Sequence, residues 1–181
     1  MDILLLAAAQ RLRAPWLDRV MPAVTHLADN GLIWIVVAAA LLAFRRTRRG
    51  GVMLALALII DLIFCNGVLK PLFHRVRPFD VNPAVELLIA RPTDYSFPSG
   101  HTAVSFAAAT VIWPLNRKWG VAAFALAALI ALSRLYLYVH YPSDILGGAL
   151  AGALFGYAAI RLTPVLEKAI AKRGKADHGG G

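Results

Sequence analysis

The chain has 181 residues, about the length of one domain, and 59% of them are hydrophobic, which is more than a soluble domain carries. Its 19 Lys and Arg residues outnumber 10 Asp and Glu residues, but they cluster between apolar runs, which argues against a nucleic-acid partner. The single cysteine, Cys65, excludes an internal disulfide and a cysteine-based metal site. The composition therefore predicts an integral membrane protein.

The first thirty residues predict an N-terminal amphipathic segment. The apolar stretch before Gln10 is short, and it follows Asp2 rather than a basic region, so a cleaved signal peptide is not expected. We expect residues 1–30 to lie at the membrane interface as one or two helical pieces. If they cross the membrane instead, the chain gains one span.

Five apolar runs follow. A bilayer core about 30 Å thick needs roughly 20 apolar residues per helix. Four runs approach that length, and the first does so if its helix extends back toward Pro22. The runs are 31–44, 51–69, 98–115, 120–138 and 144–162. They predict an all-α integral membrane helical bundle of five to six spans over residues 31–162, followed by a basic cytoplasmic tail over 163–181.

The last run carries three glycines at four-residue spacing: Gly148, Gly152 and Gly156. Such a ridge of small residues lets two helix backbones approach closely. We expect it to pack within the bundle, with a dimer interface as the alternative.

The positive charges predict the orientation, because Lys and Arg favour cytoplasmic loops. Eleven of the 19 fall on one side of the predicted spans: Arg45, Arg46, Arg48, Arg49, Arg117, Lys118, Arg161, Lys168, Lys172, Arg173 and Lys175. This side is expected to be cytoplasmic. The loop over residues 70–97 is then expected on the extracytoplasmic side, and the protein is expected in the cell membrane.

Polar side chains collect at the helix ends that this topology places outside. An ionised group within a span costs about 2.5–3.5 kcal/mol on insertion scales, so such groups usually face a cavity or a partner. The converging residues are Lys70, Arg77, Ser99, His101, Arg134, His140 and Asp144. Cations beside the helix starts of "PSGH" and "YPSD" predict an anion site, with phosphate as the obvious anion.

Two histidines at a phosphate site can share nucleophilic and general-acid roles. Asp144 lies four residues after His140, close enough to accept its ring N–H and orient the imidazole. His101 then remains as the acid.

Three motifs, in this order, make the pattern specific: "KPLFHRVRP" (70–78), "PSGH" (98–101) and "SRLYLYVHYPSD" (133–144). Over roughly residues 50–162 the chain resembles the type 2 phosphatidic acid phosphatase superfamily. The resemblance implies that His140 forms a phosphohistidine, Asp144 positions it and His101 protonates the leaving oxygen. It also implies that the phosphoryl oxygens are held by Lys70, Arg77, Ser99, Gly100 and Arg134. No metal and no cofactor are implied.

Other polar residues are open to more than one interpretation. Asp61 predicts a hydrogen bond to a neighbouring helix, with Asn66 as one candidate, and the alternatives are pairing with a cation in the bundle or an effect on catalysis. His74 and Arg75 lie at variable motif positions and are either solvated or in contact with a lipid head group or the substrate. Within loop 79–97, "PAVELLIA" predicts a short extracytoplasmic amphipathic helix that helps to admit a lipid tail.

The sequence thus predicts a membrane enzyme that hydrolyses a lipid-linked phosphate or pyrophosphate at the extracytoplasmic face, with membrane lipids around it. By analogy, undecaprenyl pyrophosphate is the preferred substrate. Phosphatidylglycerophosphate, phosphatidic acid and lipid A phosphates are alternatives. Two interpretations from other classes are a transporter of lipids or anions and a non-catalytic lipid-binding protein. The oligomeric state is left open.

Overall fold

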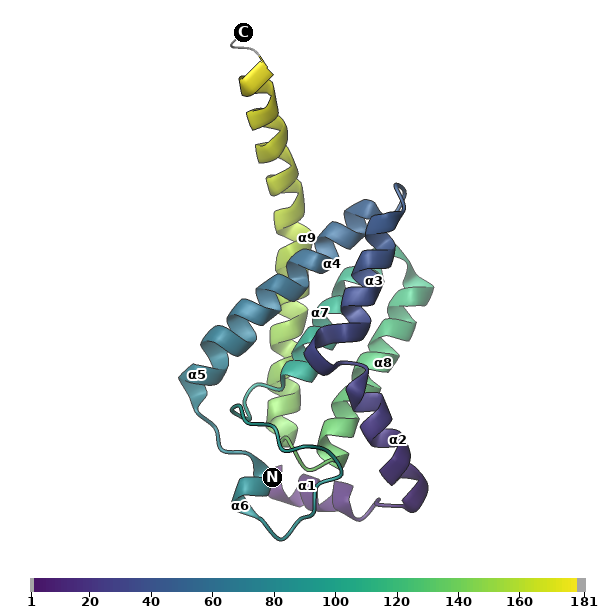
Figure 1. Cartoon of the computed structure of the whole chain (residues 1–181), viewed down its shortest axis with the longest axis vertical. Coiled ribbons are helices and arrows are strands. Elements are labelled where there is room, and N and C mark those ends of the chain that lie inside the picture. The colour runs from purple at the N-terminus through teal and green to yellow at the C-terminus, as the bar shows by residue number, and fades with distance from the viewer. Residues whose placement is uncertain (1, 179–181) are drawn as a thin grey trace.

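The computed structural model describes residues 2–178, with side chains as far as Lys172, and all regular elements in this range are helices (Figure 1). In chain order the elements are α1 (Asp2–Gln10), α2 (Pro15–His26), η1 (Asp29–Gly31), α3 (Leu32–Ala43), α4 (Arg48–Asp61), η2 (Leu62–Leu69), α5 (Lys70–Phe73), α6 (Pro78–Val81), α7 (Gly100–Leu115), α8 (Arg117–Tyr136) and α9 (Pro142–His178). The all-α prediction is confirmed. The predicted tail continues α9 as far as His178, and residues 179–181 lie outside the described part, as does Met1 of the N-terminal segment.

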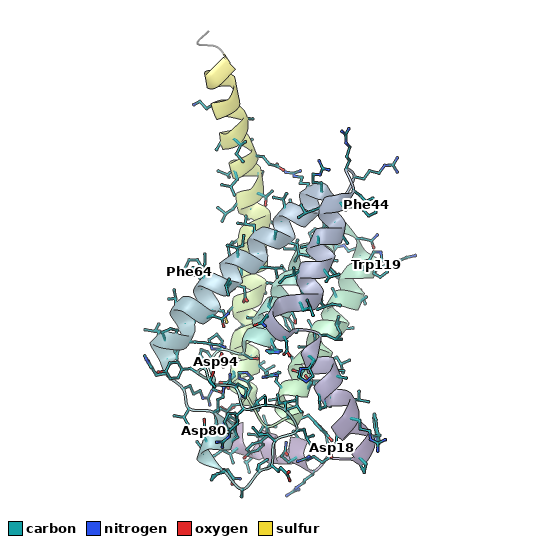
Figure 2. All side chains as sticks on the ribbon, in the orientation of Figure 1. Asp18, Phe44, Phe64, Asp80, Asp94 and Trp119 are labelled. Carbon is teal, nitrogen blue, oxygen red and sulfur yellow. The ribbon has the colours of Figure 1, made fainter. Side chains whose placement is uncertain are left out.

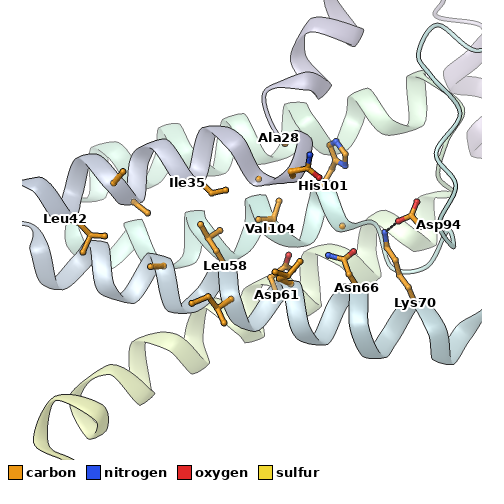
Figure 3. A pocket seen from close by; sticks show the side chains of 18 residues that line it. Ala28, Ile35, Leu42, Leu58, Asp61, Asn66, Lys70, Asp94, His101 and Val104 are labelled. Atoms are coloured by element: carbon orange, nitrogen blue, oxygen red, sulfur yellow. Dashed lines mark hydrogen bonds and ion pairs between the residues drawn. The ribbon is translucent and has the colours of Figure 1, made fainter. Parts of the chain in front are cut away.

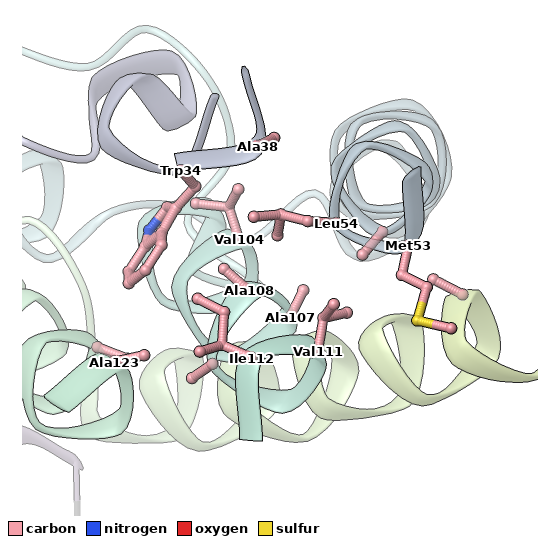
Figure 4. Packing of buried hydrophobic residues seen from close by; sticks show 14 of the residues in the cluster. Trp34, Ala38, Met53, Leu54, Val104, Ala107, Ala108, Val111, Ile112 and Ala123 are labelled. Carbon is pink, nitrogen blue, oxygen red and sulfur yellow. The ribbon is translucent and has the colours of Figure 1, made fainter. Parts of the chain in front are cut away.

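Helix α7 lies at the centre of the bundle and packs against α4, α8 and α9. Nine of its 16 residues are buried, and many of these are alanines, whose small side chains let neighbouring helices approach. Figure 4 shows Val104, Ala108 and Ile112 of α7 among side chains of α3, α4 and α8. Because α7 is surrounded, its first turn emerges amid the ends of its neighbours.

The glycine ridge of α9 packs against α7. A Cβ atom on Gly152 would lie 2.1 Å from the Ala103 carbonyl oxygen, and one on Gly156 would lie 2.6 Å from that of Ala107. The two backbones therefore touch. The ridge is used within the chain, as expected.

Exposed apolar side chains cover the outside of the bundle, with Leu146, Leu150 and Leu154 on the face of α9 away from the ridge. By length and composition, the helical segments Arg48–Val81, Arg117–Tyr136 and Pro142–Lys172 could each cross a membrane. The bent pair Pro15–His26 and Asp29–Ala43 would make a fourth span, consistent with a first span that extends back past Pro22. The count of five to six spans stays a prediction, as do the interfacial positions.

The N-terminal helices and the loop between α5 and α7 lie at one end of the bundle, opposite the projecting end of α9 (Figure 1). Figure 2 shows Asp18, Asp80 and Asp94 toward that end and Phe44 and Trp119 toward the other. These three aspartates therefore lie toward the end where the predicted site residues converge.

Two predictions about local structure are wrong. The "PAVELLIA" stretch forms turns and bends, and the only helix described in loop 79–97 is α6 at its start. Leu87, Leu88 and Ile89 instead pack on the cluster around Phe79, so tertiary packing overrides the helical pattern. Asp61 is 3% exposed, and its Oδ1 has no hydrogen-bond partner among the described residues, so the bond expected to Asn66 or a neighbouring helix is not formed by that atom.

Candidate active site

His140 lies in the turn between α8 and α9, with 1% of its surface exposed. Its Nε2 is 3.2 Å from Nη1 of Arg77, and its Nδ1 is 3.4 Å from Oδ2 of Asp144. The imidazole thus has a cation at one nitrogen and a carboxylate at the other. This is the pairing that the four-residue spacing predicts, although the carboxylate contact is long.

Asp144 lies in the first turn of α9, which Pro142 begins, and four groups hold its carboxylate. Oδ1 accepts a hydrogen bond of 2.6 Å from Arg75 Nη1, while Oδ2 accepts bonds of 2.5 Å from the Ser96 hydroxyl and 2.9 Å from the Tyr141 N–H. The fourth group is the imidazole itself. The carboxylate is fully buried and fixed in orientation.

Two of these groups were missed by the sequence interpretation. Arg75 was expected to be either solvated or in contact with a lipid head group or the substrate, yet it donates hydrogen bonds to Asp144, Ser143 and Asp2. Its position inside the first motif was the available signal. Ser96 lies just before "PSGH", and no spacing in the sequence singles it out.

Lys70, the first residue of α5, and Arg77, the N-cap of α6, converge on the Asp94 carboxylate. Lys70 Nζ contacts Oδ2, and Arg77 Nη2 donates to Oδ1 over 2.6 Å. Burial raises the pKa of Asp94, but the hydrogen bonds and charges of Lys70 and Arg77 outweigh it and hold that pKa well below its usual range. The two cations predicted to bind phosphate therefore already hold an anion.

Arg134, near the end of α8, is 3% exposed and donates to the Thr25 hydroxyl over 2.6 Å. Its Nε is buried without a hydrogen-bond partner in the part of the chain that the structure describes. A buried donor of this kind costs free energy unless it is paired. A phosphoryl oxygen would satisfy it, so the geometry suits the predicted role.

The start of α7 lies beside these groups. Ser99 is the N-cap, and its N–H donates to the Asp144 carbonyl oxygen over 3.1 Å, which joins the starts of α7 and α9. A Cβ atom on Gly100 would lie 3.5 Å from Lys70 Nζ. The backbone at Gly100 can therefore face an anion held by Lys70.

His101 follows in the first turn of α7, and its Nε2 is 2.8 Å from Oδ1 of Asp29. Its side chain is 22% exposed, far more than that of His140. The sequence interpretation missed Asp29, although the Asp-Asn-Gly run after α2 is a turn signal that could have drawn attention to it.

The environment of His140 favours its neutral form. Burial lowers the pKa of His140 well below its ordinary value, and the charges of Arg77, Arg134 and Lys70 lower it further. A neutral imidazole keeps a lone pair for attack. The pKa shift and the two nitrogen contacts are what a nucleophile needs.

A cavity of about 660 Å³ opens beside this cluster. Its polar end is lined by Lys70, Asp94, Gly100 and His101, and it continues between α3 and α4 along Ile35 and Leu58 to Leu42 (Figure 3). The lining is mostly apolar beyond the polar end. The arrangement can hold a phosphate group attached to a lipid chain.

The eight predicted site residues thus lie at one end of the bundle. His140 contacts Arg77 through one ring nitrogen and Asp144 through the other. Asp94 links Lys70 to Arg77, and the Ser99 N–H is bonded to the Asp144 carbonyl oxygen. The charges of Arg134 and His101 act on His140. Among residues 2–172, whose side chains the structure describes, no group of three or more His, Cys, Asp or Glu side chains is placed to hold a metal ion.

Comparisons with known proteins agree with this geometry. The PAP2 superfamily profile matches residues 50–168. The chain is 36% identical over 132 residues to an undecaprenyl-diphosphatase of Sulfolobus acidocaldarius, a match that covers 72% of this chain and 63% of that protein. It is 34% identical over 160 residues to phosphatidylglycerophosphatase B of Bacillus subtilis, covering 81% and 75% of the two chains.

A solved structure is similar as well. The crystal structure of Aquifex aeolicus LpxE matches with a TM-score of 0.78 at 30% identity, covering 88% of this chain and 94% of that chain. The chain spans less than two thirds of the length of the Sulfolobus relative and most of the length of the other two. With its apolar helices and this cluster of residues, the chain is a multi-pass membrane protein of the PAP2 superfamily.

Proposed function

We propose that the chain hydrolyses undecaprenyl pyrophosphate to the monophosphate through a phosphohistidine on His140. The observation that carries this proposal is the placement of His140 between Arg77 and Asp144, where Arg77 is joined through Asp94 to the polar end of an apolar cavity. The similarity to a protein named undecaprenyl-diphosphatase supports the choice of substrate.

In the first step, the terminal phosphate is held by Lys70, Arg77, Arg134, Ser99 and the Gly100 backbone. The lone pair on His140 Nε2 attacks phosphorus, and the bond from phosphorus to the bridging oxygen breaks. His101 gives a proton to that oxygen as it leaves. Asp144 keeps the His140 Nδ1–H in place and stabilises the positive charge that forms on the ring.

In the second step, water attacks the phosphorus of the phosphohistidine. His101, now neutral, takes a proton from this water, and the bond from phosphorus to nitrogen breaks so that its electron pair returns to His140. Inorganic phosphate leaves. Both histidines are then restored to their starting protonation states, so the cycle consumes one water and needs no other reactant.

Phosphate binding in this scheme requires the cations to change partners. Asp94 occupies Lys70 and Arg77, and its side chain is 49% exposed, so it can turn toward solvent. The incoming phosphate then takes the same two donors. An isoprenoid chain would extend from there along the apolar lining between α3 and α4.

We propose that this site faces the extracytoplasmic side of the cell membrane. The support is the charge distribution: the loop with Arg45, Arg46, Arg48 and Arg49 joins α3 to α4 at the end away from the α6 loop (Figure 1). Recycling of a carrier lipid outside the cell would need a phosphatase in this orientation.

The test is phosphate release by the detergent-purified protein from undecaprenyl pyrophosphate, phosphatidylglycerophosphate and phosphatidic acid, with a chelator present. We expect the first substrate to give the highest kcat/KM and His140→Ala to abolish release. Preference for phosphatidylglycerophosphate would move the assignment toward the function named for the Bacillus subtilis relative. Release that persists in His140→Ala would contradict the phosphohistidine.

A further inference from the structure

A second carboxylate lies between two imidazoles, outside the three motifs. Asp29 begins η1, and its Oδ1 is 2.8 Å from His101 Nε2, while its Oδ2 is 2.6 Å from His26 Nδ1. Each carboxylate oxygen is thus used by one ring. The family profile begins at residue 50 and does not include Asp29 or His26.

The chain bends sharply to bring Asp29 to this position. The axes of α2 and the following helical segment differ by 46°, and Asn30 and Gly31 adopt left-handed backbone conformations with φ of 51° and 74°. The bend places η1 against α7. Asp29 therefore reaches the first turn of α7, where His101 lies.

The same segment contacts the site at a second point. Thr25, at the end of α2, is fully buried, and its hydroxyl accepts a hydrogen bond of 2.6 Å from Arg134. Thr25 and Asp29 together approach the acid histidine and a phosphate-binding arginine from the side opposite α9. The N-terminal segment thus forms one wall of the site.

We propose that Asp29 is the positioning residue for the general acid His101, with His26 fixing the carboxylate from its other side. With Nε2 bonded to Asp29, the remaining nitrogen, Nδ1, is the one that can serve the leaving oxygen. Burial and the charges of Arg134 from α8 and Lys70 from α5 disfavour protonation of the His101 ring, and Asp29 is the carboxylate that opposes them. This role rests on the proposed function.

The proton balance assigns no net transfer to Asp29. In the first step the His101 Nδ1–H proton passes to the leaving oxygen, and the ring stays neutral with its Nε2–H donated to Asp29. In the second step Nδ1 regains a proton from the attacking water. Asp29 therefore stabilises the protonated ring before the first step and after the second, and it selects which nitrogen reacts.

The discriminating experiment uses two leaving groups. A short-chain phosphatidic acid has an alkoxide leaving group that needs a proton, whereas p-nitrophenyl phosphate has one that does not. For Asp29→Asn in the full chain we expect kcat/KM on the lipid to fall about tenfold to a hundredfold, because a general acid supplies roughly 10²–10⁴. The kcat/KM on p-nitrophenyl phosphate should change by less than about threefold, since it reports only the steps up to departure of the leaving group and this leaving group needs no acid.

The matched control is Asp80→Asn, because the Asp80 side chain is 45% exposed, as is that of Asp29, and it pairs only with Arg91 at 3.8 Å. It should leave both activities unchanged. Asp29→Glu should recover part of the lost rate. His26→Gln should lower kcat/KM on the lipid in the same selective manner but less, and it serves as the test if Asp29→Asn does not fold.

The pH profile gives a further readout that a purely structural role would not move. The acid must be protonated, so kcat on the lipid falls as pH rises through its titration. Without the Asp29 charge this basic limb should shift to lower pH. Equal losses on both substrates, or an unmoved basic limb, would overturn the role of Asp29. No release by the unmodified protein from these two substrates or from undecaprenyl pyrophosphate would overturn the proposed function itself.

Discussion

The two histidine and carboxylate pairs of the site differ in how firmly they are held. His140 and Asp144 are almost completely buried, and Arg75, Ser96 and a backbone N–H fix the carboxylate. His101 lines the cavity, the side chains of His101 and Asp29 are 22% and 45% exposed, and His26 is the other partner of Asp29. The first pair is held in a fixed orientation and is called the locked pair, whereas the second is partly exposed and is called the open pair.

The difference matches two kinds of work. A nucleophile must attack along one line, and misplacement of about 1 Å can cost 10²-fold in rate. A general acid must instead face a leaving group that departs and a water that arrives, which requires access from the cavity. Burial with many hydrogen bonds suits the first task, and partial exposure suits the second.

The sharpest test of the locked pair is Asp144→Asn. The amide has one acceptor oxygen instead of two and carries no negative charge, so it orients the His140 ring less well and no longer stabilises its positive charge. We therefore expect kcat to fall on the order of 10³-fold or more, as for a misoriented catalytic imidazole. The measurement is kcat on a short-chain lipid phosphate beside Asp29→Asn, with gel filtration to verify folding. Equal losses in the two variants would remove the distinction between the pairs.

Arg75→Met tests whether the orientation of Asp144 in the locked pair depends on Arg75, which lies at a variable position of the first motif. Arg75 binds Asp144, Ser143 and Asp2 and lies over the Tyr141 ring at 4.2 Å. Its loss should free the Asp144 carboxylate and lower kcat about tenfold to a hundredfold, because supporting hydrogen bonds orient catalytic groups to that extent. Arg91→Met, at a side chain 60% exposed, is the control. An unchanged kcat would assign the orientation of Asp144 to Ser96 and the backbone alone.

The protonation of His140 provides a third test. Burial and neighbouring cations lower its pKa, and only the neutral ring attacks, so kcat/KM should stay level as pH falls past about 6.5, the ordinary histidine value. Arg77→Gln removes one cation and should move the acid limb to higher pH. Both proteins act on the same substrate, so its own titration cancels in the difference. An acid limb at the same pH in both would show that Arg77 does not act on this ring.

The smallest effect is expected for Asp94→Asn. Asp94 competes with an external anion for Lys70 and Arg77, but it is half exposed, and pairs of that kind are weak because water screens them. Removing its charge should lower the inhibition constant of orthovanadate about threefold to tenfold. Asp80→Asn again serves as the control. Weaker inhibition in Asp94→Asn would mean that the carboxylate organises the cations for phosphate and does not compete with it.

The eight predicted site residues could be expected to lie together because helix ends on the same side of a membrane are close to one another, however the helices pack. Lys70, Ser99, Arg134 and His140 illustrate this, since each lies at or beside the end of a helix. Motif spacing also gave the contact between His140 and Asp144, because four residues make one turn.

The supporting residues could not be predicted in the same way. Arg75, Asp94 and Ser96 lie in loops, and Asp29 lies at a bend whose direction depends on two left-handed residues. Hydrophobic periodicity carries no information about such segments. It also gave a wrong prediction at 83–90, where Leu87 and Leu88 follow a helical pattern but lie in a segment of turns and bends that packs on the cluster around Phe79.

The contact between the glycine ridge of α9 and the backbone of α7 affects which faces of α9 can accept substitutions during evolution. The separation between Ser99 and Asp144 is set by main-chain atoms that touch, and the Ser99 N–H closes it over 3.1 Å. The lipid-facing side of α9, with Leu146, Leu150 and Leu154, takes no part in that contact. Substitutions there can follow the lipid composition of a host membrane while the reacting groups keep their spacing, so adaptation to a new bilayer and conservation of the chemistry occur on opposite faces of one helix.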